Sequence, residues 1–313
     1  MKKTRILAVV VCALAVANIA SAEIIRGIDI NFVTIGNAGN AADTGGTVGC
    51  GAVSYGYRIG KYEVTNAQWN TFTDAAGAPT GNPSSAYDQN ALYTGAQQPT
   101  GNVSWYETLQ FCNYLTSGDK SKGAYQFSGN NANPGYFQGI NRKAAQTTYG
   151  TIYVIPTEDE WYKAAYHKND GVTGNYWLYP TQSNSVPSND LINPDPGNNA
   201  NFQQDDYTIG DPNYLTAVGE FENSDSAYGT FDQGGNVWEW NETLSSNSYR
   251  RLRGGSCQGY PGAEGLSSSY QYSGPQSAEY WKIGFRVAYV PEPTSAAIIT
   301  LAGLFIALKR RKR

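Results

Sequence analysis

The chain has 313 residues, among them 35 Gly, 24 Tyr and 14 Pro, but only 15% of its residues are charged. This length suffices for a substantial hydrophobic core, and no charged or Pro-Ser linker divides its middle, so one domain is expected. Abundant Gly and Tyr with few charges favour a loop-rich fold with little regular secondary structure. The formal net charge of −4 argues against nucleic acids and anionic lipid surfaces as partners, because both are polyanions.

The first 22 residues have the features of a secretory signal peptide. Residues 1–5 are basic, residues 6–17 form an apolar run, and Ala20-Ser21-Ala22 matches a small-x-small cleavage site. The apolar run is too short for a membrane-spanning helix, which needs about 20 residues. We therefore expect export, with a mature chain that begins near Glu23.

Three helix starts share one signature, the capping box. In this motif a Ser or Thr hydroxyl and a Glu or Gln side chain three residues later satisfy each other's free backbone N–H groups. Apolar residues at helical spacing follow each start. The pairs are Thr65 with Gln68, Ser104 with Glu107, and Thr157 with Glu160. The Glu and Gln residues of these pairs are therefore predicted to be caps rather than catalytic groups.

Between the predicted helices the sequence indicates short strands and long loops. Strands are predicted at residues 58–63 and 284–289, and the segment 180–211, dense in Gly, Asn, Pro and Asp, predicts a long ordered loop. Charged clusters have structural interpretations. Glu158-Asp159-Glu160 lies at a helix start, where negative charge is stabilised, and the cluster of Arg250, Arg251 and Arg253 is expected to pair with the acidic excess.

Four cysteines are present, and Cys12 lies in the predicted signal peptide. Cys112 falls within a predicted amphipathic helix and is expected to be a buried small hydrophobe. Cys50 and Cys257 have the option of forming a disulfide in an oxidising compartment. Without the signal peptide the chain has three cysteines, an odd number, so they cannot all form disulfides with one another.

The C-terminal end has three parts in a fixed order. Val290-Pro291-Glu292-Pro293 precedes an apolar stretch at residues 296–308 and the basic cluster 309–313. This arrangement resembles the PEP-CTERM sorting signal. The resemblance implies a transient inner-membrane anchor over residues 290–313, cleavage by an exosortase-type enzyme, and release to the cell envelope or extracellular matrix. Without both ends the domain keeps 14 basic and 25 acidic residues, so its net charge is near −11.

Five motifs occur in order between about Val33 and Ala288. They are Tyr62-Glu63-Val64-Thr65-Asn66, Val103-Ser104-Trp105-Tyr106-Glu107, Ile155-Pro156-Thr157-Glu158-Asp159-Glu160-Trp161, Gly234-Gly235-Asn236-Val237-Trp238-Glu239-Trp240, and Arg253-Gly254-Gly255-Ser256 with Gly284-Phe285-Arg286-Val287. Together they resemble the signature blocks of the formylglycine-generating enzyme (sulfatase-modifying factor) family. The resemblance implies one α+β domain over residues 23–289 with a C-type-lectin-like fold.

The segment 232–239 combines two carboxylates with a Gly-Gly turn, which suits calcium because calcium takes six to eight oxygen ligands from carboxylates and carbonyls. Matched to the family's calcium motif, the ligands are the side chains of Asp232 and Glu239 and the carbonyls of Gly235 and Val237. A second family site corresponds to the side chains of Asn201 and Asp211 and the carbonyls of Phe202 and Asn213, with a shorter intervening loop. The alternative is a carboxylate-stabilised turn without metal.

The resemblance also locates the family's catalytic chemistry. In its oxidases a cysteine pair after the Gly-Gly-Ser motif binds Cu(I) through soft thiolates. The corresponding positions are Gly259 and Glu264, whereas Cys257 lies two residues too early. Another branch of the superfamily holds non-haem iron with three histidines, and the only histidine here is His167, expected either at the surface or at the C-terminal end of the capped helix. Calcium is thus the expected cofactor, and copper and iron are not.

Two functions remain open. The first is a non-catalytic, calcium-stabilised scaffold of the envelope or matrix that binds a glycan or a peptide, since Tyr and Trp offer flat apolar faces with polar edges. Its ligand cleft is expected around Ser256, Cys257, Tyr260 and Trp281, with Tyr270, Tyr272 and Tyr280 nearby. The second is an enzyme, either a divergent oxidase that uses Cys257 or another activity in the same cleft.

Overall fold

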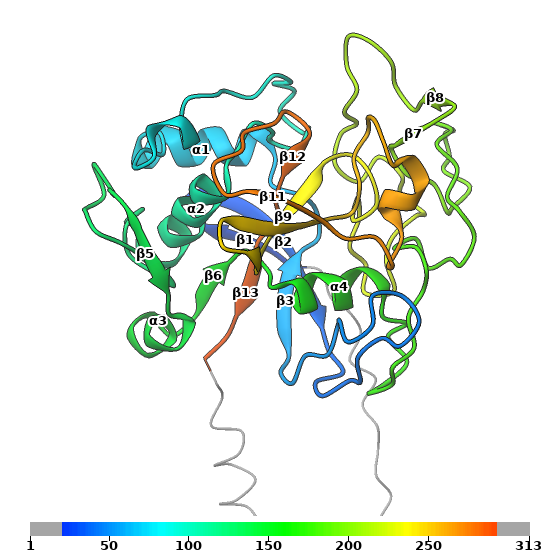
Figure 1. The fold of residues 1–313 in the computed structure, drawn as a ribbon, viewed down its shortest axis with the longest axis horizontal. Helices are drawn as coiled ribbons and strands as arrows, with labels where there is room; N and C mark the ends of the chain where they lie inside the picture. The colour runs from blue at the N-terminus through cyan, green and yellow to red at the C-terminus, as the bar shows by residue number, and fades with distance from the viewer. Residues whose placement is uncertain (1–20, 293–313) are drawn as a thin grey trace, which may run out of the picture.

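The computed structural model describes residues 21–292 of the chain (Figure 1). Its two main β-sheets are largely antiparallel. The larger sheet has five strands, in the order β1 (Ser21–Ile25), β2 (Ile28–Ile35), β3 (Tyr57–Gly60), β13 (Ala288–Val290) and β6 (Ile152–Val154). All its neighbouring strands are antiparallel. The two ends of the described chain therefore belong to one sheet, and the predicted cleavage point before Glu23 falls within β1.

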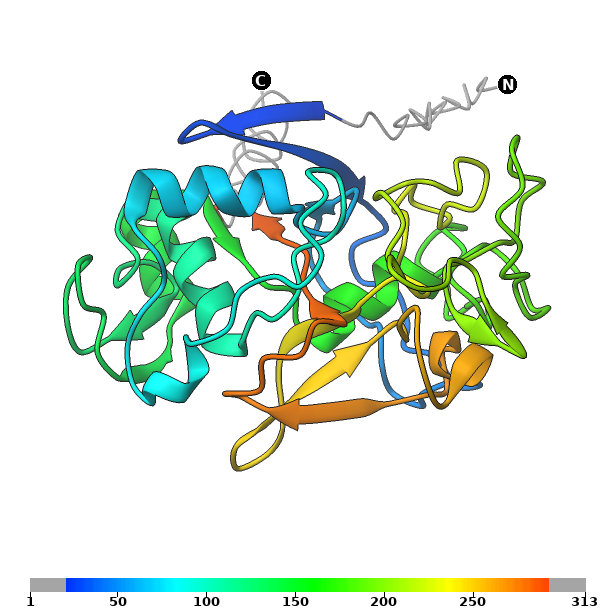
Figure 2. The same cartoon turned by 90° about the horizontal axis from the view of Figure 1, so that it is seen from above.

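The smaller sheet lies on the opposite side of the molecule from the β1–β2 hairpin, with helices between them (Figure 2). Its order is β11 (Tyr272–Pro275), β10 (Tyr249–Arg253), β9 (Trp238–Ser246) and β12 (Ile283–Gly284), and only the β12–β9 pair is parallel. Two further hairpins pair β4 (Tyr125–Phe127) with β5 (Phe137–Ile140), and β7 (Gln203–Gln204) with β8 (Asp206–Tyr207).

All three predicted capping boxes are confirmed. They open α1 (Asn66–Ala76), α2 (Trp105–Ser117) and α4 (Glu158–Tyr166), and in each the N-cap hydroxyl and the N3 side chain bond each other's backbone N–H. The helix α3 (Arg142–Tyr149) was not predicted. It begins at Asn141, whose side chain accepts from the Ala144 N–H (2.9 Å), but it buries only Ala145, so it has no apolar periodicity to detect.

The predicted strands are only partly correct. The first appears as β3 and ends at Gly60. The second is split into β12 and β13, because Phe285 and Val287 instead accept from the N–H groups of Val64 (2.9 Å) and Gly60 (2.7 Å). This leaves the side chain of Arg286 directed into the interior, where it is fully buried.

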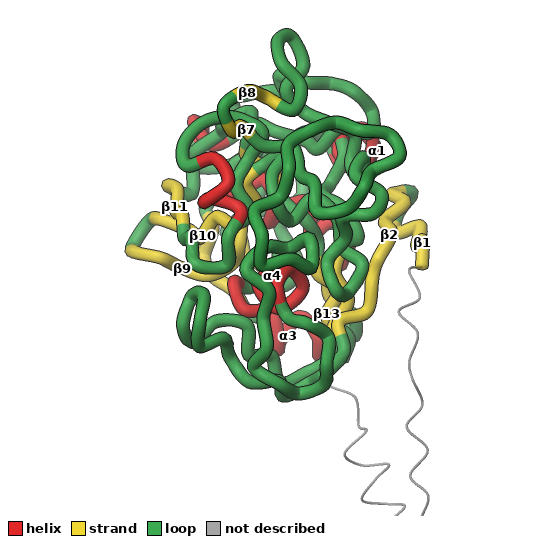
Figure 3. Tube along the Cα trace, turned by 90° about the vertical axis from the view of Figure 1, so that its right-hand side faces the viewer, coloured by secondary structure: helices red, strands yellow, loops and turns green. Residues whose placement is uncertain are grey.

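Long loops cover much of the surface (Figure 3). The predicted loop at 180–211 is confirmed, with only β7 and β8 as regular structure. Its order has a local cause in the buried carboxylate of Asp195. The two oxygens of this carboxylate accept from the Gly197 N–H (2.9 Å), the Asn199 amide (2.8 Å), the Asn223 N–H (3.0 Å) and the Ser224 hydroxyl (2.7 Å). One side chain thereby ties the loop to itself and to residues 223–224.

The main core joins both sheets to α1 and α2 through Phe32, Phe72, Trp105, Trp240 and Phe285. Cys112 lies in this core, as predicted. The disulfide considered for Cys50 and Cys257 is wrong. All three cysteines within residues 21–292 are free, and Cys50 packs near Tyr162 whereas Cys257 packs against Leu215 and Val237.

Between residues 21 and 292, no helix has the length and apolar character needed to cross a membrane. The predicted signal-peptide core and the apolar and basic parts of the predicted sorting signal lie outside the described residues.

Candidate functional site

The turn at residues 232–237 brings Asn201 of the second predicted calcium site next to Gly235 of the first. Asp232 and Asn236 have φ of 57°, and Gly235 has φ of 90°, all in the left-handed region that favours glycine. A β-carbon on Gly235 would collide with the backbone oxygen of Asn201. Glycine thus permits residues 201 and 235 to pair, and the Asn236 N–H donates to the Asn201 carbonyl (2.7 Å).

Beneath this turn lies a buried cluster of charges centred on Glu239. One oxygen of Glu239 accepts from Arg286 Nη2 (2.7 Å), and the other accepts from Arg286 Nε (2.7 Å) and Trp161 Nε1 (2.8 Å). Glu63, also buried, accepts from the Asn236 amide (3.0 Å) and the Val237 N–H (3.3 Å). Sequence reasoning missed the role of Glu63, although this residue stands in the first motif.

The cluster carries an excess of negative charge, with the carboxyls of Glu63, Asp232 and Glu239 near one guanidinium. Burial, together with the carboxylates of Asp232 and Glu239, raises the pKa of Glu63 well above its usual value. Burial also raises the pKa of Asp232 to about 6. Buried like charges destabilise one another unless a proton or a cation offsets them.

The predicted ligands fit calcium in part. Glu239 already accepts three hydrogen bonds, and Asp232 accepts one from the Gly219 N–H (2.6 Å). Within residues 21–292, Asn201 Oδ1 is buried and has no hydrogen-bond partner, so this oxygen is available as a metal ligand. Asp232 also lines a small cavity of about 10 Å³, which holds about one water-sized group.

The fit does not come from carboxylates alone. No group of three or more His, Cys, Asp or Glu in the described chain is arranged to hold a metal. Amide and backbone oxygens would have to complete the coordination shell, as they commonly do for calcium. In the second predicted site, Asn201 and Phe202 are buried whereas Asp211 and Asn213 are exposed.

The positions of the missing cysteine pair hold no soft ligand. The Gly259 N–H donates to the side-chain oxygen of Gln203 (2.8 Å), and Glu264 is exposed on the 3₁₀ helix η2 (Gly262–Leu266). Cys257 is 1% exposed, and burial raises the pKa of its thiol far above the ordinary range. Because the thiolate is the metal ligand and the nucleophile, this cysteine is held in its unreactive form.

The expected ligand cleft is only partly assembled. Cys257 and Trp281 come together with Leu215 and Val237, and Ser256 donates to the Gln258 carbonyl (3.1 Å). Tyr260 instead stands 88% exposed on the surface. Sequence reasoning missed the rings of Tyr93 and Tyr214, which pack against Trp281, and the ring of Tyr207, which packs against Tyr214. These rings lie between the sequence motifs, and no local signal marks them.

The charged clusters and His167 have structural roles. Arg253 pairs with Glu158 (2.6 Å), as predicted, while Arg250 donates to the Glu242 carbonyl (2.7 Å) and stacks on Trp105. Of the two positions considered for His167, the C-terminal helix end is correct, because the residue is the C-cap of α4, and the surface position is not. Both nitrogens of the buried ring are engaged, Nδ1 with the Tyr228 hydroxyl (2.8 Å) and Nε2 with the Thr173 carbonyl (3.2 Å).

The fold and the site together define a class of protein: a loop-rich α+β domain with a C-type-lectin-like arrangement, a Gly-Gly turn over a buried ion pair, and no thiol pair at its cleft. Residues 47–290 match the family described as "Sulfatase-modifying factor enzyme 1-like domain". Because the match spans most of the chain, the chain belongs to this family. A search of curated proteins gave no match.

Three solved structures share the fold. "Treponema denticola variable protein 1" has 20% identity and a TM-score of 0.55, and the alignment covers 88% of this chain and 100% of that one. CarF has 18% identity and a TM-score of 0.56, with coverages of 83% and 97%. PvdO from Pseudomonas aeruginosa has 15% identity and a TM-score of 0.55, with coverages of 86% and 98%. At these identities the likeness concerns the fold alone, and it confirms the expected fold class.

Proposed function

We propose that this chain is a non-catalytic, ligand-binding member of the sulfatase-modifying factor family. The observation that carries the proposal is the lack of an accessible thiol where the family's oxidases have a cysteine pair. Positions 259 and 264 are Gly and Glu, and the one cysteine nearby is buried with its thiol pKa raised. A copper-dependent oxidation needs accessible thiolates to hold the metal. The experiment that tests the proposal is the incubation of the copper-treated protein with a sulfatase-type peptide.

The place of action follows from the two ends of the sequence. The basic and apolar residues 1–22 favour export, and the Pro-Glu-Pro segment with its apolar and basic tail favours a transient inner-membrane anchor. An exosortase-type enzyme would then release the domain to the cell envelope or extracellular matrix. A binding module suits this location, because it needs no supply of an intracellular cofactor.

Calcium is proposed as the structural cofactor of this module. The side chains of Asp232 and Asn201 and the carbonyls of Gly235, Val237 and Phe202 would hold it, and its role would be to fasten the turn to the neighbouring loop. Three observations support this: the negative excess around Arg286, the buried unpaired Asn201 Oδ1, and the small cavity beside Asp232. The cation would supply stability and no chemical step.

Removal of calcium is therefore expected to lower the melting temperature. A ligand present at about 100 times its Kd and bound only to the native state contributes about 2.7 kcal/mol. For a domain of this size that corresponds to roughly 5–10 °C. Asp232→Asn should abolish the response to chelator and to added calcium, as measured by differential scanning calorimetry.

The control for this experiment is Asp74→Asn, which removes an exposed carboxylate on α1 and should leave the calcium response intact. Glu239→Ala is not informative, because it would unpair the buried Arg286 whether or not calcium binds. A full calcium response in Asp232→Asn would show that calcium, if it binds, does so elsewhere.

A further inference from the structure

An open groove of about 850 Å³ lies beside the predicted cleft. One wall is the loop at residues 92–98, and the other contains Asp211, Pro212, Asn213 and Ala217. This volume falls in the range that holds drug-sized ligands. Its lining contains none of the residues around which the sequence predicted the ligand cleft, namely Ser256, Cys257, Tyr260 and Trp281.

The two walls of the groove are fastened to each other. The Val218 N–H donates to the Gln97 carbonyl (2.9 Å), and the side chain of Gln98 donates to the Leu215 carbonyl (2.8 Å). At the other edge, the amide of Asn66 at the start of α1 donates to the carbonyls of Tyr93 (2.9 Å) and Gly95 (3.0 Å). The groove is therefore preorganised, which reduces the entropy that a ligand must overcome.

An aromatic cluster stands at this groove, and Tyr93 belongs to both. The ring of Tyr93 lies 5.3 Å from Trp281 and 6.4 Å from Tyr214, and Tyr214 lies 4.9 Å from Tyr207. All four rings are partly exposed, and they buttress each other at tilted or edge-on angles. Rigid aromatic faces with polar edges match the apolar C–H faces of pyranose rings.

The charges of the groove restrict its ligand further. Among the residues that line it, all within the described chain, Asp211 is the one acidic residue, and none is basic. Gln97, Asn213 and Thr94 are exposed and offer amides and a hydroxyl, which both donate and accept hydrogen bonds. A lining without a cation cannot pair with the carboxylates, sulfates or phosphates of an anionic ligand.

From these observations we propose that the groove between residues 92–98 and 211–217 binds a neutral saccharide chain. The proposal rests on the binding function proposed above and specifies its ligand class and its place. Tyr93 provides the stacking face, and the side chains of Gln97, Asp211 and Asn213 bond the hydroxyls. A peptide is disfavoured, because the groove has no partner for its acidic groups and no row of free strand atoms for its backbone.

The test measures binding of the mature protein recovered from cells to soluble polysaccharides by affinity gel electrophoresis. The neutral probes are a β-glucan, a mannan and a galactomannan, and the anionic probe is alginate. We expect retardation by at least one neutral probe and none by alginate. Tyr93→Ala should weaken that binding at least tenfold, with the fold monitored by the melting temperature.

A second variant keeps the test independent of packing by Tyr93. Asn213→Ala removes an exposed groove amide and leaves all residues proposed above to hold calcium unchanged, so a several-fold loss of binding reports on the groove. The matched control is Tyr260→Ala, which should bind like the unmodified protein.

Three results would overturn the proposal: binding to alginate alone, binding to none of these probes, or a loss in Tyr260→Ala with none in the two groove variants. None of these results would contradict the proposal that the protein is non-catalytic, because that proposal is tested separately, by whether the protein oxidises a sulfatase-type peptide.

Discussion

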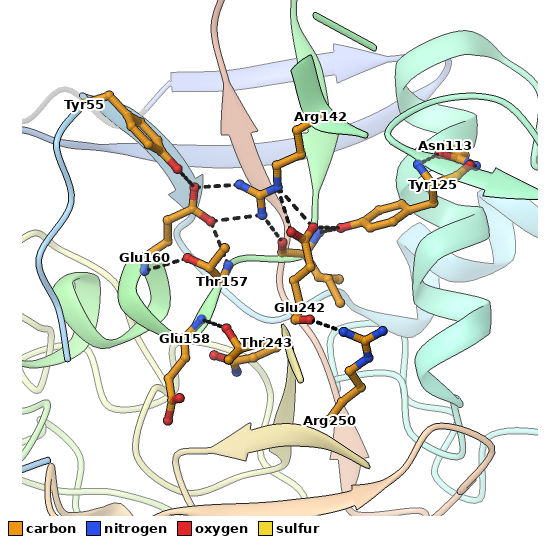
Figure 4. A network of polar contacts seen from close by, with 12 residues as sticks. Tyr55, Asn113, Tyr125, Arg142, Thr157, Glu158, Glu160, Glu242, Thr243 and Arg250 are labelled. Atoms are coloured by element: carbon orange, nitrogen blue, oxygen red, sulfur yellow. Dashed lines mark hydrogen bonds and ion pairs between the residues drawn. The ribbon is translucent and has the colours of Figure 1, made fainter. Parts of the chain in front are cut away.

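Replacing Arg142 with Leu is expected to lower the free energy of unfolding by about 3–5 kcal/mol, because it leaves two buried carboxylates without a counter-ion. The guanidinium donates to both oxygens of Glu160 (2.8 and 3.1 Å) and to Glu242 (3.0 Å), as Figure 4 shows. Tyr55 and Tyr125 complete the network by donating to Glu160 (2.6 Å) and Glu242 (2.7 Å). Burial alone would raise the pKa of the Glu160 carboxyl, but the charge and hydrogen bonds of Arg142 lower this pKa by more, so it lies below its usual value.

The matched control for this prediction is an exposed ion pair. Lys122 lies 3.1 Å from Asp119 with its side chain 65% exposed, so Lys122→Ala should cost less than about 1 kcal/mol. Urea unfolding followed by tryptophan fluorescence compares both variants with the unmodified chain. If Arg142→Leu proved no more destabilising than Lys122→Ala, the network would not support the fold as described.

Gly235→Ala is expected to be the most damaging single change in the candidate metal site, with a cost of about 3 kcal/mol or more. The added methyl would meet the backbone oxygen of Asn201, and the φ of 90° disfavours any side chain. The pairing of residues 201 and 235 would separate, so the calcium response should be lost together with stability.

Gly210→Ala serves as its control, because a β-carbon there meets no atom within 4 Å and the backbone has no left-handed φ. This substitution should be neutral or stabilise the protein by up to about 1 kcal/mol. Calorimetry with and without calcium measures both effects. If the Gly235→Ala variant had the melting temperature and the calcium response of the unmodified chain, the assigned turn would be refuted.

The features predicted correctly from the sequence are those that depend on residues close together in the chain. The capping boxes at Thr65, Ser104 and Thr157 are satisfied within one helical turn, and all three are correct. The same holds for burial of Cys112 on its helix. The strand predicted at 284–289 failed because Arg286 interrupts it to reach Glu239, a contact across 47 residues that no local pattern reveals.

The candidate site could be predicted only where a motif encodes it. Glu63, Trp161, Glu239 and Arg286 come from four separate motifs and meet in one buried cluster, mediated in the case of Glu63 by Asn236. These motifs therefore specify the scaffold, which explains how the chain retains them without the cysteine pair. The groove could not be predicted, since Tyr93, Tyr214 and Trp281 meet only through long-range packing.

The most direct test of the non-catalytic proposal is mass spectrometry of a Cys-x-Pro-x-Arg peptide incubated with the protein, Cu(I) and oxygen. A family member that has both cysteines serves as the positive control. The peptide cysteine is expected to remain unmodified, because the site offers one buried thiol where copper needs two thiolates. Formation of formylglycine by the unmodified chain, abolished by Cys257→Ser, would contradict the account and make the protein an oxidase.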